Sequence, residues 1–470
     1  MKQFITMQSD KPLAIGKRIL LCVHQFFPFF SAGTEVLTLS TAEALRAQGH
    51  QVEIVTAKLD DIESLERSTY VYKDFTVHQF NIPYAPGKFS RTRMIDEYHN
   101  ASIYQPFRAL LEQLNPDLVH FFHLKNLTIA ALNACFDEKI PTVYTPTDYW
   151  ISCRSCQLVK PWGKAECTGP NLLAGNCLKH VAINNKKGAT RTLLALTPQL
   201  MFSSVALTAS TLINTRLKLL VSPLVDLSNR KKVITEALLK VDRILPPTLF
   251  IENLLLQTGL PQSRIQRLRY GIQPPLIHPK EPDLATPTKT TATFGFIGTL
   301  TEHKGCHIFM QAIKSLPHAN ARFLVYGDKQ QYPEYFNKLE SIIQEDKRVR
   351  FMGTFPHENI GNILSSLDAL VIPSTWRENA PLVLLNALAC GTPVIASDVT
   401  GITEYLGKDD NVAVFEPGNP RQLAQRIESR LAMVNDPAHN QSQGRMAGES
   451  LDAYVNVLSG VYADLINPHE

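Results

Sequence analysis

The sequence predicts an α/β protein made of two doubly wound domains, each a parallel sheet covered by helices on both faces. In both halves of the chain, short apolar strand-like runs alternate with helix-like stretches. Residues 273–289, with five prolines and no periodicity, separate the halves as a linker. The length of 470 residues and an apolar share of 44% suit two or three domains with sizeable cores.

The first half opens with the strand–helix order of a doubly wound domain. The expected strands are residues 19–23, 51–57, 118–122 and 142–144. The expected helices are residues 34–48 and 127–136. A loop rich in Pro and Phe joins the first strand to the first helix, and Gly49 stops that helix as a left-handed cap.

The second half repeats this plan. The expected strands are residues 293–297, 323–326, 349–352, 369–372 and 394–397. The intervening helices are expected to begin near Lys304, Tyr335, His357 and Pro381. Sheets of this kind bind ligands at the carboxyl ends of their strands, so the segments that follow the strands are the candidate binding segments.

We place an N-terminal domain at residues 1–278, a C-terminal domain at 290–445, and a helix at 446–470 that packs back on the N-terminal domain. Residues 151–240 interrupt the N-terminal domain with four cysteines, an uncharged stretch and several basic side chains. The basic face is either simply solvated or docks on anionic lipid. The uncharged stretch is too polar for a membrane span, although a helix lying on the bilayer surface fits it.

The net charge of the chain limits the classes of partner that it is expected to bind. A net charge of +4 and the lack of any run of five Lys or Arg argue against a nucleic-acid binder. A phosphate-bearing small molecule and an anionic membrane surface fit equally well. The N-terminus lacks the pattern of a signal peptide, so we expect a cytoplasmic protein, peripheral on the inner face of the membrane if the insertion binds lipid.

Residues 295–305 (GFIGTLTEHKG) combine a strand, a glycine turn and a helix start. The glycines let the backbone approach a ligand closely, and Lys304 lies where a helix N-terminus already favours an anion. This pattern predicts a phosphate site, although any strand–helix turn can use glycine.

Residues 377–397 (RENAPLVLLNALACGTPVIAS) contain a helix with both ends marked. Pro381 suits the first helical turn and Gly391 ends the helix. Glu378 stands before the helix, where a carboxylate can accept hydrogen bonds from sugar hydroxyls while backbone amides hold a diphosphate. The alternative is that Glu378 only compensates the helix dipole.

Longer motifs carry a resemblance to a known family. They are the Gly33 loop with GHQVEIVTA, VDRILPPT with YGIQ, GTLTEHKG, FLVYGD, VRFMGTF, the block 372–406 and NVAVFEPGNPRQLA. With these motifs the sequence resembles glycosyltransferase family 4, retaining enzymes of the GT-B fold with two Rossmann-like domains facing a central cleft. The resemblance covers most of the chain, and the block 372–406 is its most specific part.

The resemblance implies three catalytic residues. Glu378 would contact the donor sugar, Lys304 would neutralise the leaving diphosphate, and Asp148 would lie near the sugar. It also implies a wider donor-binding set, in which backbone after Glu378 holds sugar and pyrophosphate, Gly33 lines the diphosphate and Asn386 binds ribose. That set is Gly33, Gly298, Thr299, Lys304, Glu378, Asn379, Ala380, Pro381, Leu382 and Asn386.

Three positions depart from the family pattern. Asn386 replaces the second Glu of the motif, and an amide lacks the stronger charge-assisted acceptor for ribose. Thr299 replaces an Arg that supplies a phosphate cation, and Thr147 replaces a histidine proposed to assist at the sugar. These departures bear on the expected rate and donor, and not on the fold.

No Asp-x-Asp pair is present to hold a diphosphate through a divalent metal. We therefore expect no catalytic cofactor, with Lys304 and helix-terminal amides stabilising the departing diphosphate. The same-face outcome of the family implies that the leaving phosphate oxygen takes the acceptor's proton, so no enzyme nucleophile is required.

Three histidines are candidate acceptor contacts. His24, His120 and His123 lie at the ends of first-domain strands, where acceptor hydroxyls can reach them. The alternative for each of them is a packing or capping role.

The cysteine segment predicts a structural zinc site. Cys153, Cys167, Cys177 and His180 form a sound tetrahedral set, with Cys156 as the alternative to Cys153. Zinc would staple an insertion too small for a core of its own. The alternative is four free or disulfide-bonded cysteines.

The leading hypothesis is a retaining glycosyltransferase. It would move a sugar from a UDP-, GDP- or ADP-linked donor to a glycan, a glycolipid or a polysaccharide intermediate. A non-catalytic nucleotide-sugar-binding subunit or scaffold stays open because of Thr147, Thr299 and Asn386. A nucleotide-sugar epimerase is the other enzyme considered, and the block 372–406 argues against it.

Overall fold

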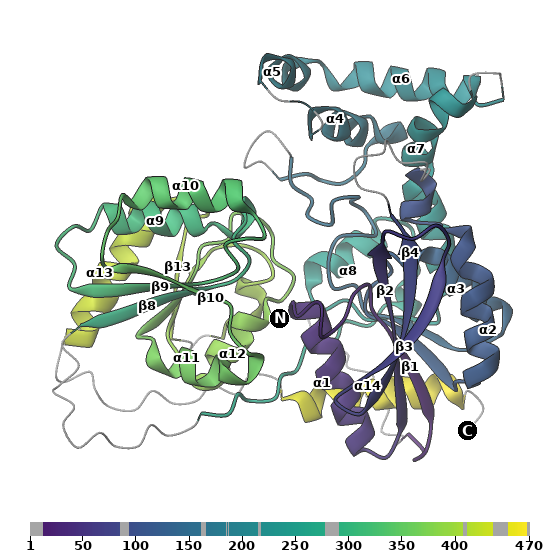
Figure 1. The fold of residues 1–470 in the computed structure, drawn as a ribbon, viewed down its shortest axis with the longest axis horizontal. Helices are drawn as coiled ribbons and strands as arrows, with labels where there is room; N and C mark the ends of the chain where they lie inside the picture. Colours follow the sequence, from purple (N-terminus) through teal and green to yellow (C-terminus); the bar gives the residue numbers. More distant parts are fainter. Residues whose placement is uncertain are drawn as a thin grey trace. The chain divides into compact units, whose positions relative to one another are not determined.

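The structure is a computed structural model that describes most of the chain. The described residues are 13–84, 94–160, 166–184, 186, 188–214, 218–277, 291–407, 411–435 and 450–467. The chain divides into two compact units (Figure 1). Unit 1 is residues 1–269 with 451–470, and unit 2 is residues 270–450.

Unit 1 is built on a seven-stranded sheet. Its strands are β1 (Arg18–Cys22), β2 (Gln51–Asp60), β3 (Glu66–Tyr72), β4 (Phe75–Pro83), β5 (Leu118–Phe121), β6 (Thr142–Tyr144) and β7 (Arg243–Ile244). They follow the order β3-β4-β2-β1-β5-β6-β7, and all neighbours are parallel except the pair β3–β4. Without β3 this is the Rossmann order, with its switch point between β1 and β5.

Nine helices belong to unit 1 among the described residues. They are α1 (Gly33–Ala47), α2 (Tyr104–Leu114), α3 (Thr128–Asp137), α4 (Gly175–Asn184), α5 (Gly188–Leu196), α6 (Gln199–Leu212), α7 (Lys218–Leu238), α8 (Leu249–Leu256) and α14 (Leu451–Ile466). Helix α1 stops where Gly49 adopts φ 90°, a left-handed conformation that favours glycine. Helices α4, α5 and α6 are grouped at one end of unit 1, apart from its sheet (Figure 1).

The C-terminal helix α14 completes the core of unit 1. Tyr454 and Leu458 of this helix are buried, and Ser459 Oγ donates a hydrogen bond to Gln48 Oε1 at 2.8 Å. The chain therefore leaves unit 1 after Arg269 and returns to it at Leu451.

Unit 2 has a six-stranded, wholly parallel sheet. Its strands are β8 (Ala292–Ile297), β9 (Ala321–Tyr326), β10 (Val349–Gly353), β11 (Ala369–Ile372), β12 (Val394–Ser397) and β13 (Val412–Phe415). The order β10-β9-β8-β11-β12-β13 is again the Rossmann order, and its switch point lies between β8 and β11.

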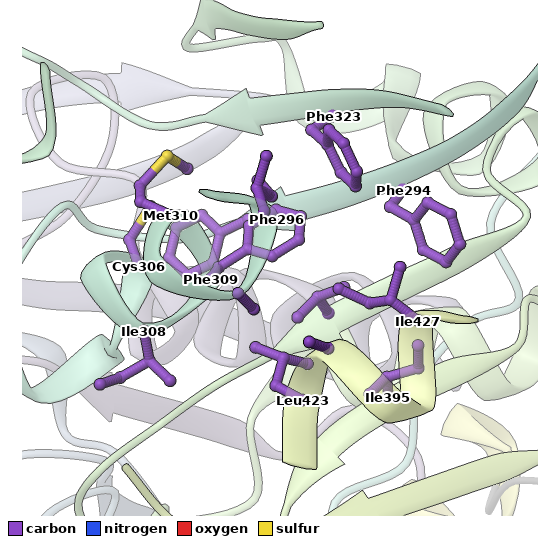
Figure 2. Close-up of a cluster of buried hydrophobic side chains, with 14 of the residues drawn as sticks. Phe294, Phe296, Cys306, Ile308, Phe309, Met310, Phe323, Ile395, Leu423 and Ile427 are labelled. Carbon is purple, nitrogen blue, oxygen red and sulfur yellow. The ribbon is translucent and has the colours of Figure 1, made fainter. Parts of the chain in front are cut away.

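The helices of unit 2 cover this sheet. They are α9 (Cys306–Lys314), α10 (Pro333–Ile343), α11 (Ile360–Ser366), α12 (Leu382–Cys390) and α13 (Pro420–Asn435). Figure 2 shows one of the buried clusters, in which Phe294 and Phe323 of the sheet pack with Phe309 of α9 and with Leu423 and Ile427 of α13. This core fixes the strand ends that carry the candidate site.

The boundary between the units lies nine residues before the predicted position, residue 278. Tyr270 N–H donates to Tyr405 Oη at 3.4 Å, and Ile272 forms a bridge with Ser450, so the chain already packs on unit 2 here. Residues 278–289 of the expected linker lie outside the described residues. Helix α9 begins at Cys306, after a short 3-10 turn over Glu302–Lys304, rather than at Lys304.

Candidate functional site

Two loops of unit 2 meet at the switch point of its sheet. The loop after β8 passes through Gly298 and Thr299 to Lys304, and the loop after β11 passes through Ser374 to Glu378. Neighbouring parallel strands end at the same edge of a sheet, so residues 74 positions apart in the sequence come into contact here.

Lys304 and Glu378 form a bidentate ion pair. Lys304 Nζ lies 2.8 Å from Glu378 Oε1 and 2.9 Å from Oε2. Ser374 Oγ donates a further hydrogen bond to Oε1 at 2.5 Å, so the carboxylate is held from two sides. Glu378 is 3% exposed, whereas the Lys304 side chain is 26% exposed. The ammonium group therefore remains accessible to a ligand.

Glu378 is ionised in spite of its burial. Burial alone would raise the pKa of this carboxyl, but the Lys304 charge and the hydrogen bonds from Lys304 and Ser374 outweigh it and lower the pKa below its ordinary value. A buried carboxylate in this state can accept hydrogen bonds from sugar hydroxyls, while the ammonium beside it attracts an anion.

His303 and Trp376 border the ion pair. Their ring centroids lie 4.7 Å apart, and Lys304 Nζ lies 5.2 Å from the centre of the Trp376 ring. The His303 carbonyl accepts the Thr375 N–H at 2.8 Å, which ties the two loops together. Burial, followed by the Lys304 charge, lowers the pKa of His303 to about 4, so its ring is neutral at pH 7.

Helix α12 begins at Leu382, four residues after Glu378. Ala380 takes a positive φ of 54°, Pro381 is the N-cap, and the left-handed Gly391 ends the helix. The N–H of Leu384 makes the first hydrogen bond of the helix, to the Pro381 carbonyl at 2.9 Å. The predicted Asn379–Leu382 segment thus forms a helix N-terminus, where backbone amides and the helix dipole favour an anion. Asn386 is buried within the same helix.

Gly401 holds Glu378 in place and supplies a test. Its φ is 86°, and a Cβ added there would lie 1.8 Å from the Glu378 carbonyl oxygen. Gly401→Ala should therefore cost about 3 kcal/mol of stability and displace Glu378. Thermal unfolding measures the first effect and nucleotide binding the second.

Gly353→Ala is the matched control, because Gly353 has a similar φ of 74° with nothing within 4 Å of the added Cβ. It should lose only about 1 kcal/mol, the cost of the left-handed backbone itself. Equal losses in the two variants would contradict the close contact at Glu378.

Unit 1 places three predicted residues together at its own switch point. His24 follows β1, His123 follows β5 and Asp148 follows β6. The rings of His24 and His123 lie 4.1 Å apart, and His123 Nε2 is 2.8 Å from Asp148 Oδ2. The Lys125 N–H donates to His123 Nδ1 at 2.9 Å, so the ring proton is on Nε2 and is donated to Asp148.

Asp148 is ionised and oriented. Burial alone would raise its pKa, but the electrostatic interaction and hydrogen bond with His123 and the hydrogen bond from the Trp150 N–H, at 2.7 Å from Oδ1, lower it below the ordinary value. Thr147, which precedes Asp148, donates its hydroxyl to the Phe122 carbonyl at 3.0 Å. Its side chain is thus used within unit 1.

Glu35 also belongs to this group, although the sequence motifs did not predict it. Glu35 lies in the first turn of α1, is fully buried, and places Oε1 3.8 Å from His24 Nε2. Burial raises the pKa of Glu35. Burial, followed by electrostatic interactions with His123 and Lys125, lowers the pKa of His24 well below its usual range. An acidic residue two positions after Gly33, at the start of an otherwise uncharged helical turn, was the available signal.

Of the two roles considered for His120, acceptor contact and packing, the structure supports packing. It is fully buried, with Nδ1 2.6 Å from Tyr462 Oη and Nε2 2.8 Å from Thr145 Oγ1. Both ring nitrogens are used to join the sheet to α14, so His120 has the packing role.

The predicted zinc ligands lie in and before α4. All eight cysteines of the chain are free thiols. Burial, followed by the charges of Cys153 and Cys167, raises the pKa of Cys177 to about 12. The three thiols would repel one another when ionised, but among the described residues no three of the predicted ligand atoms of Cys153, Cys167, Cys177 and His180 lie within 4.8 Å of one another. His180 has a pKa lowered to about 4 by burial and by Lys160 and Lys179, so its imidazole is neutral.

Three residues of unit 1 outside the predicted zinc set have possible metal-ligand atoms close together. Among the described residues, possible ligand atoms of His123, Asp148 and Cys156 lie within 4.8 Å of one another. However, His123 Nδ1 accepts the Lys125 N–H, so Nε2 carries a proton and cannot bind a cation in this arrangement. We therefore assign His123 and Asp148 as a hydrogen-bonded pair.

The sequence models of two families match the chain. The model described as Glycosyltransferase Family 4 matches residues 31–162, and that described as Glycosyl transferases group 1 matches residues 281–445. Together, the two matches support a glycosyltransferase of the family 4 type. The first match contains His123 and Asp148 of unit 1 but not His24, and the second contains the Lys304–Glu378 ion pair of unit 2.

Individual relatives match mainly over part of their length. A 2-deoxystreptamine glucosyltransferase of Streptomyces kanamyceticus is 29% identical over 32% of this chain and 38% of its own length. A D-inositol 3-phosphate glycosyltransferase of Corynebacterium efficiens is 28% identical over 30% of this chain and 36% of its own. The chain thus spans well under half the length of these curated relatives.

Solved structures share the fold over almost the whole chain. A sucrose-phosphate synthase of Thermosynechococcus elongatus covers 96% of this chain with a TM-score of 0.60 and 16% identity, and 100% of that structure is covered. A glycosyltransferase of Rickettsia africae covers 97% with a TM-score of 0.59 and 14% identity, again over 100% of its own chain. With its two Rossmann sheets, the chain has the GT-B fold that sequence analysis predicted.

Proposed function

We propose that this protein is a retaining glycosyltransferase that moves a sugar from a nucleotide-diphosphate donor to a glycan or lipid-linked acceptor. The observation that carries the proposal is the Lys304–Glu378 ion pair beside the N-terminus of α12. Two solved structures of similar fold contain nucleotides, which supports a nucleotide-linked donor. They are an Anabaena protein in complex with UDP-glucose and an Arabidopsis thaliana starch synthase bound to ADP.

In the proposed reaction, unit 2 stabilises the leaving group. Lys304 and the N-terminus of α12 supply positive charge where the diphosphate develops negative charge. The bond between the anomeric carbon and the phosphate oxygen breaks, and a bond to the acceptor oxygen forms on the same face. The acceptor's hydroxyl proton passes to the leaving phosphate oxygen. Glu378 holds the sugar hydroxyls. Because the acceptor attacks on the face from which the diphosphate leaves and the leaving phosphate oxygen takes its proton, no covalent enzyme intermediate is needed.

Unit 1 would orient the acceptor. Asp148 is ionised and can accept a hydrogen bond from a hydroxyl, while His123 fixes its direction. His24 lies against His123 and, as a neutral imidazole, has both donor and acceptor capacity. This set suits a polyhydroxylated acceptor better than an anionic one.

The test is nucleoside-diphosphate release from a panel of UDP-, GDP- and ADP-sugars, with and without lipid and glycan extracts. We expect one donor and one extract together to raise release, and the anomeric configuration of the product to equal that of the donor. Inversion of configuration would contradict the retaining mechanism. Donor binding without release, after several acceptor classes, would favour the non-catalytic subunit instead.

The reaction should not depend on a divalent metal. Lys304 and the α12 N-terminus take the place of a metal at the diphosphate. Initial rates should therefore remain within about twofold after EDTA treatment. Loss of turnover in EDTA that magnesium or manganese specifically restores would refute metal independence.

We also propose that the cysteine segment binds a structural zinc ion. The thiols of Cys153, Cys167 and Cys177 repel one another as anions, and a bound Zn²⁺ would neutralise that repulsion, with the neutral His180 as fourth ligand. Elemental analysis should find about one zinc per chain, and Cys177→Ser should lose it while Cys390→Ser in unit 2 keeps it. Less than about a tenth of a zinc per wild-type chain would exclude the site.

A further inference from the structure

Helices α5 and α6 leave a large apolar surface uncovered. Helix α5 has no buried residue, and α6 buries only Ala206 and Ala209. Six large apolar side chains on the two helices are at least half exposed: Leu193, Leu196, Leu200, Met201, Val205 and Leu207. We call these six residues the α5–α6 face. Single exposed apolar residues need no explanation, but six on two successive helices indicate an interaction surface.

The bend that presents this face is built into the structure. The axes of α5 and α6 differ by 88°, and Pro198 at the break is the N-cap of α6. The buried Lys179 of α4 donates to the carbonyl oxygens of Ala195 at 2.7 Å and Thr197 at 2.9 Å, which satisfies the end of α5. The bent pair is thus held on α4 by specific contacts.

The opposite side of α6 is already packed. A Cβ added at Gly175 in α4 would lie 2.2 Å from Ser203 Oγ, which shows how closely the two helices approach. Ala206 packs with Leu178 and Leu227 in a small core. The α6 part of the α5–α6 face therefore lies opposite the side that packs on α4 and α7, in the group of helices seen at one end of unit 1 (Figure 1).

Hydroxyl groups on these helices bond to their own backbone. Thr197 donates to the Leu193 carbonyl at 2.9 Å, Ser204 to Leu200 at 3.1 Å, and Thr208 to Ser204 at 3.0 Å. Hydroxyls satisfied in this way do not need water. The surface can enter an apolar medium without leaving these donors unpaired.

The positive charge around α5 and α6 indicates that the partner of the α5–α6 face is anionic. Residues 167–225 contain six Lys or Arg and no Asp or Glu. Lys186 and Arg191 lie at and near the start of α5, and both are exposed. An apolar surface bordered by cations complements an anionic lipid leaflet, which offers acyl chains beneath negative headgroups.

We propose that the α5–α6 face inserts into the headgroup region of an anionic membrane and holds the protein on one leaflet. Among the described residues, no single helix is long and apolar enough to span a bilayer, although the bent pair α5–α6 passes that test jointly. Because α6 also packs on α4 and α7, the pair lies along the membrane surface. This docking goes beyond the proposed transfer reaction and does not depend on it.

Vesicle flotation with the full-length chain tests the proposal. Vesicles of phosphatidylcholine alone are compared with vesicles of phosphatidylcholine and phosphatidylglycerol in equal parts. The wild type should float with the anionic vesicles, and Leu196→Gln/Leu200→Gln should lower its partition coefficient about tenfold or more. The matched control is Ile15→Gln/Val71→Gln, which changes two equally exposed apolar residues of unit 1 elsewhere and should bind like wild type.

Circular dichroism should show each variant to be folded, because the substituted side chains are exposed. Equal binding of wild type and Leu196→Gln/Leu200→Gln would overturn the proposal. So would flotation with neither vesicle type. A wild-type dimer that this double variant dissociates, without vesicle binding, would assign the face to a second copy of the chain instead. Vesicle binding that does not weaken at high salt would contradict a contribution from the Lys and Arg side chains of this segment.

Discussion

Glu378→Ala should lower kcat by about 100-fold or more with the correct donor and acceptor. Glu378 is buried, ionised and held by Lys304 and Ser374, so its oxygens are fixed before the substrate arrives. A preorganised carboxylate accelerates the reaction when its hydrogen bonds to the sugar are stronger in the transition state than in the ground state. Removing the carboxylate also leaves Lys304 without its partner, which disturbs the cation that the diphosphate needs.

Two further variants separate charge from shape. Glu378→Gln keeps the volume and one hydrogen-bond acceptor, so it should retain part of the activity that Glu378→Ala loses. Glu358→Ala removes an exposed carboxylate of the same unit and should behave like wild type. Wild-type kinetics in Glu378→Ala would rule out a role for this residue at the donor sugar.

Lys304→Met should reduce kcat about as severely, by 100-fold or more, because it removes the cation that stabilises the leaving diphosphate. The change also affects Glu378. Without Lys304, burial raises the pKa of Glu378 with less opposition, so its charged form disappears at higher pH. The residual activity should therefore fall on the acid side at a higher pH than in wild type.

In the wild type, the lowered pKa of Glu378 also determines how the stability of the protein depends on pH. The folded-state pKa of Glu378 lies below its ordinary value, so ionisation of Glu378 contributes stability above that ordinary value. This contribution is lost as the pH falls through the lowered pKa. Lys304→Met should remove it, which a comparison of unfolding across acid pH measures.

Lys338→Met is the matched control for Lys304→Met. Lys338 is an exposed lysine of unit 2 that also pairs with a carboxylate, Glu302, at 2.8 Å. Its removal should change neither kcat nor the acid limb of the pH profile. A Lys304→Met enzyme with the pH profile of wild type would contradict the coupling between the two groups.

The core strands of both sheets could be predicted because they are buried on both faces. Runs such as residues 19–22 and 369–372 consist of apolar residues without alternation, which is typical of parallel sheets. The antiparallel edge strand β3 (ERSTYVY) has no such run, since most of its side chains are exposed. Its position on the sheet comes from pairing with β4, which the local sequence does not encode.

The geometry of the candidate donor site could be predicted only where its residues lie in one strand–loop–helix motif. Glu378, Pro381 and Gly391 mark a helix start and end by their own chemistry. The contact between Lys304 and Glu378 depends on the strand order, with β8 beside β11, and no residue pattern states that order. Glu35 was missed for a similar reason, because its burial results from packing at the switch point of unit 1.

The most direct test of the account is calorimetric binding of UDP, GDP and ADP to wild type and to Lys304→Met. One of these nucleotides should bind wild type, and the variant should bind it about tenfold or more weakly, because the cation beside the diphosphate is lost. The corresponding nucleoside without phosphates should bind both proteins equally weakly. Equal diphosphate affinity for wild type and Lys304→Met would contradict the assignment of this site to the donor.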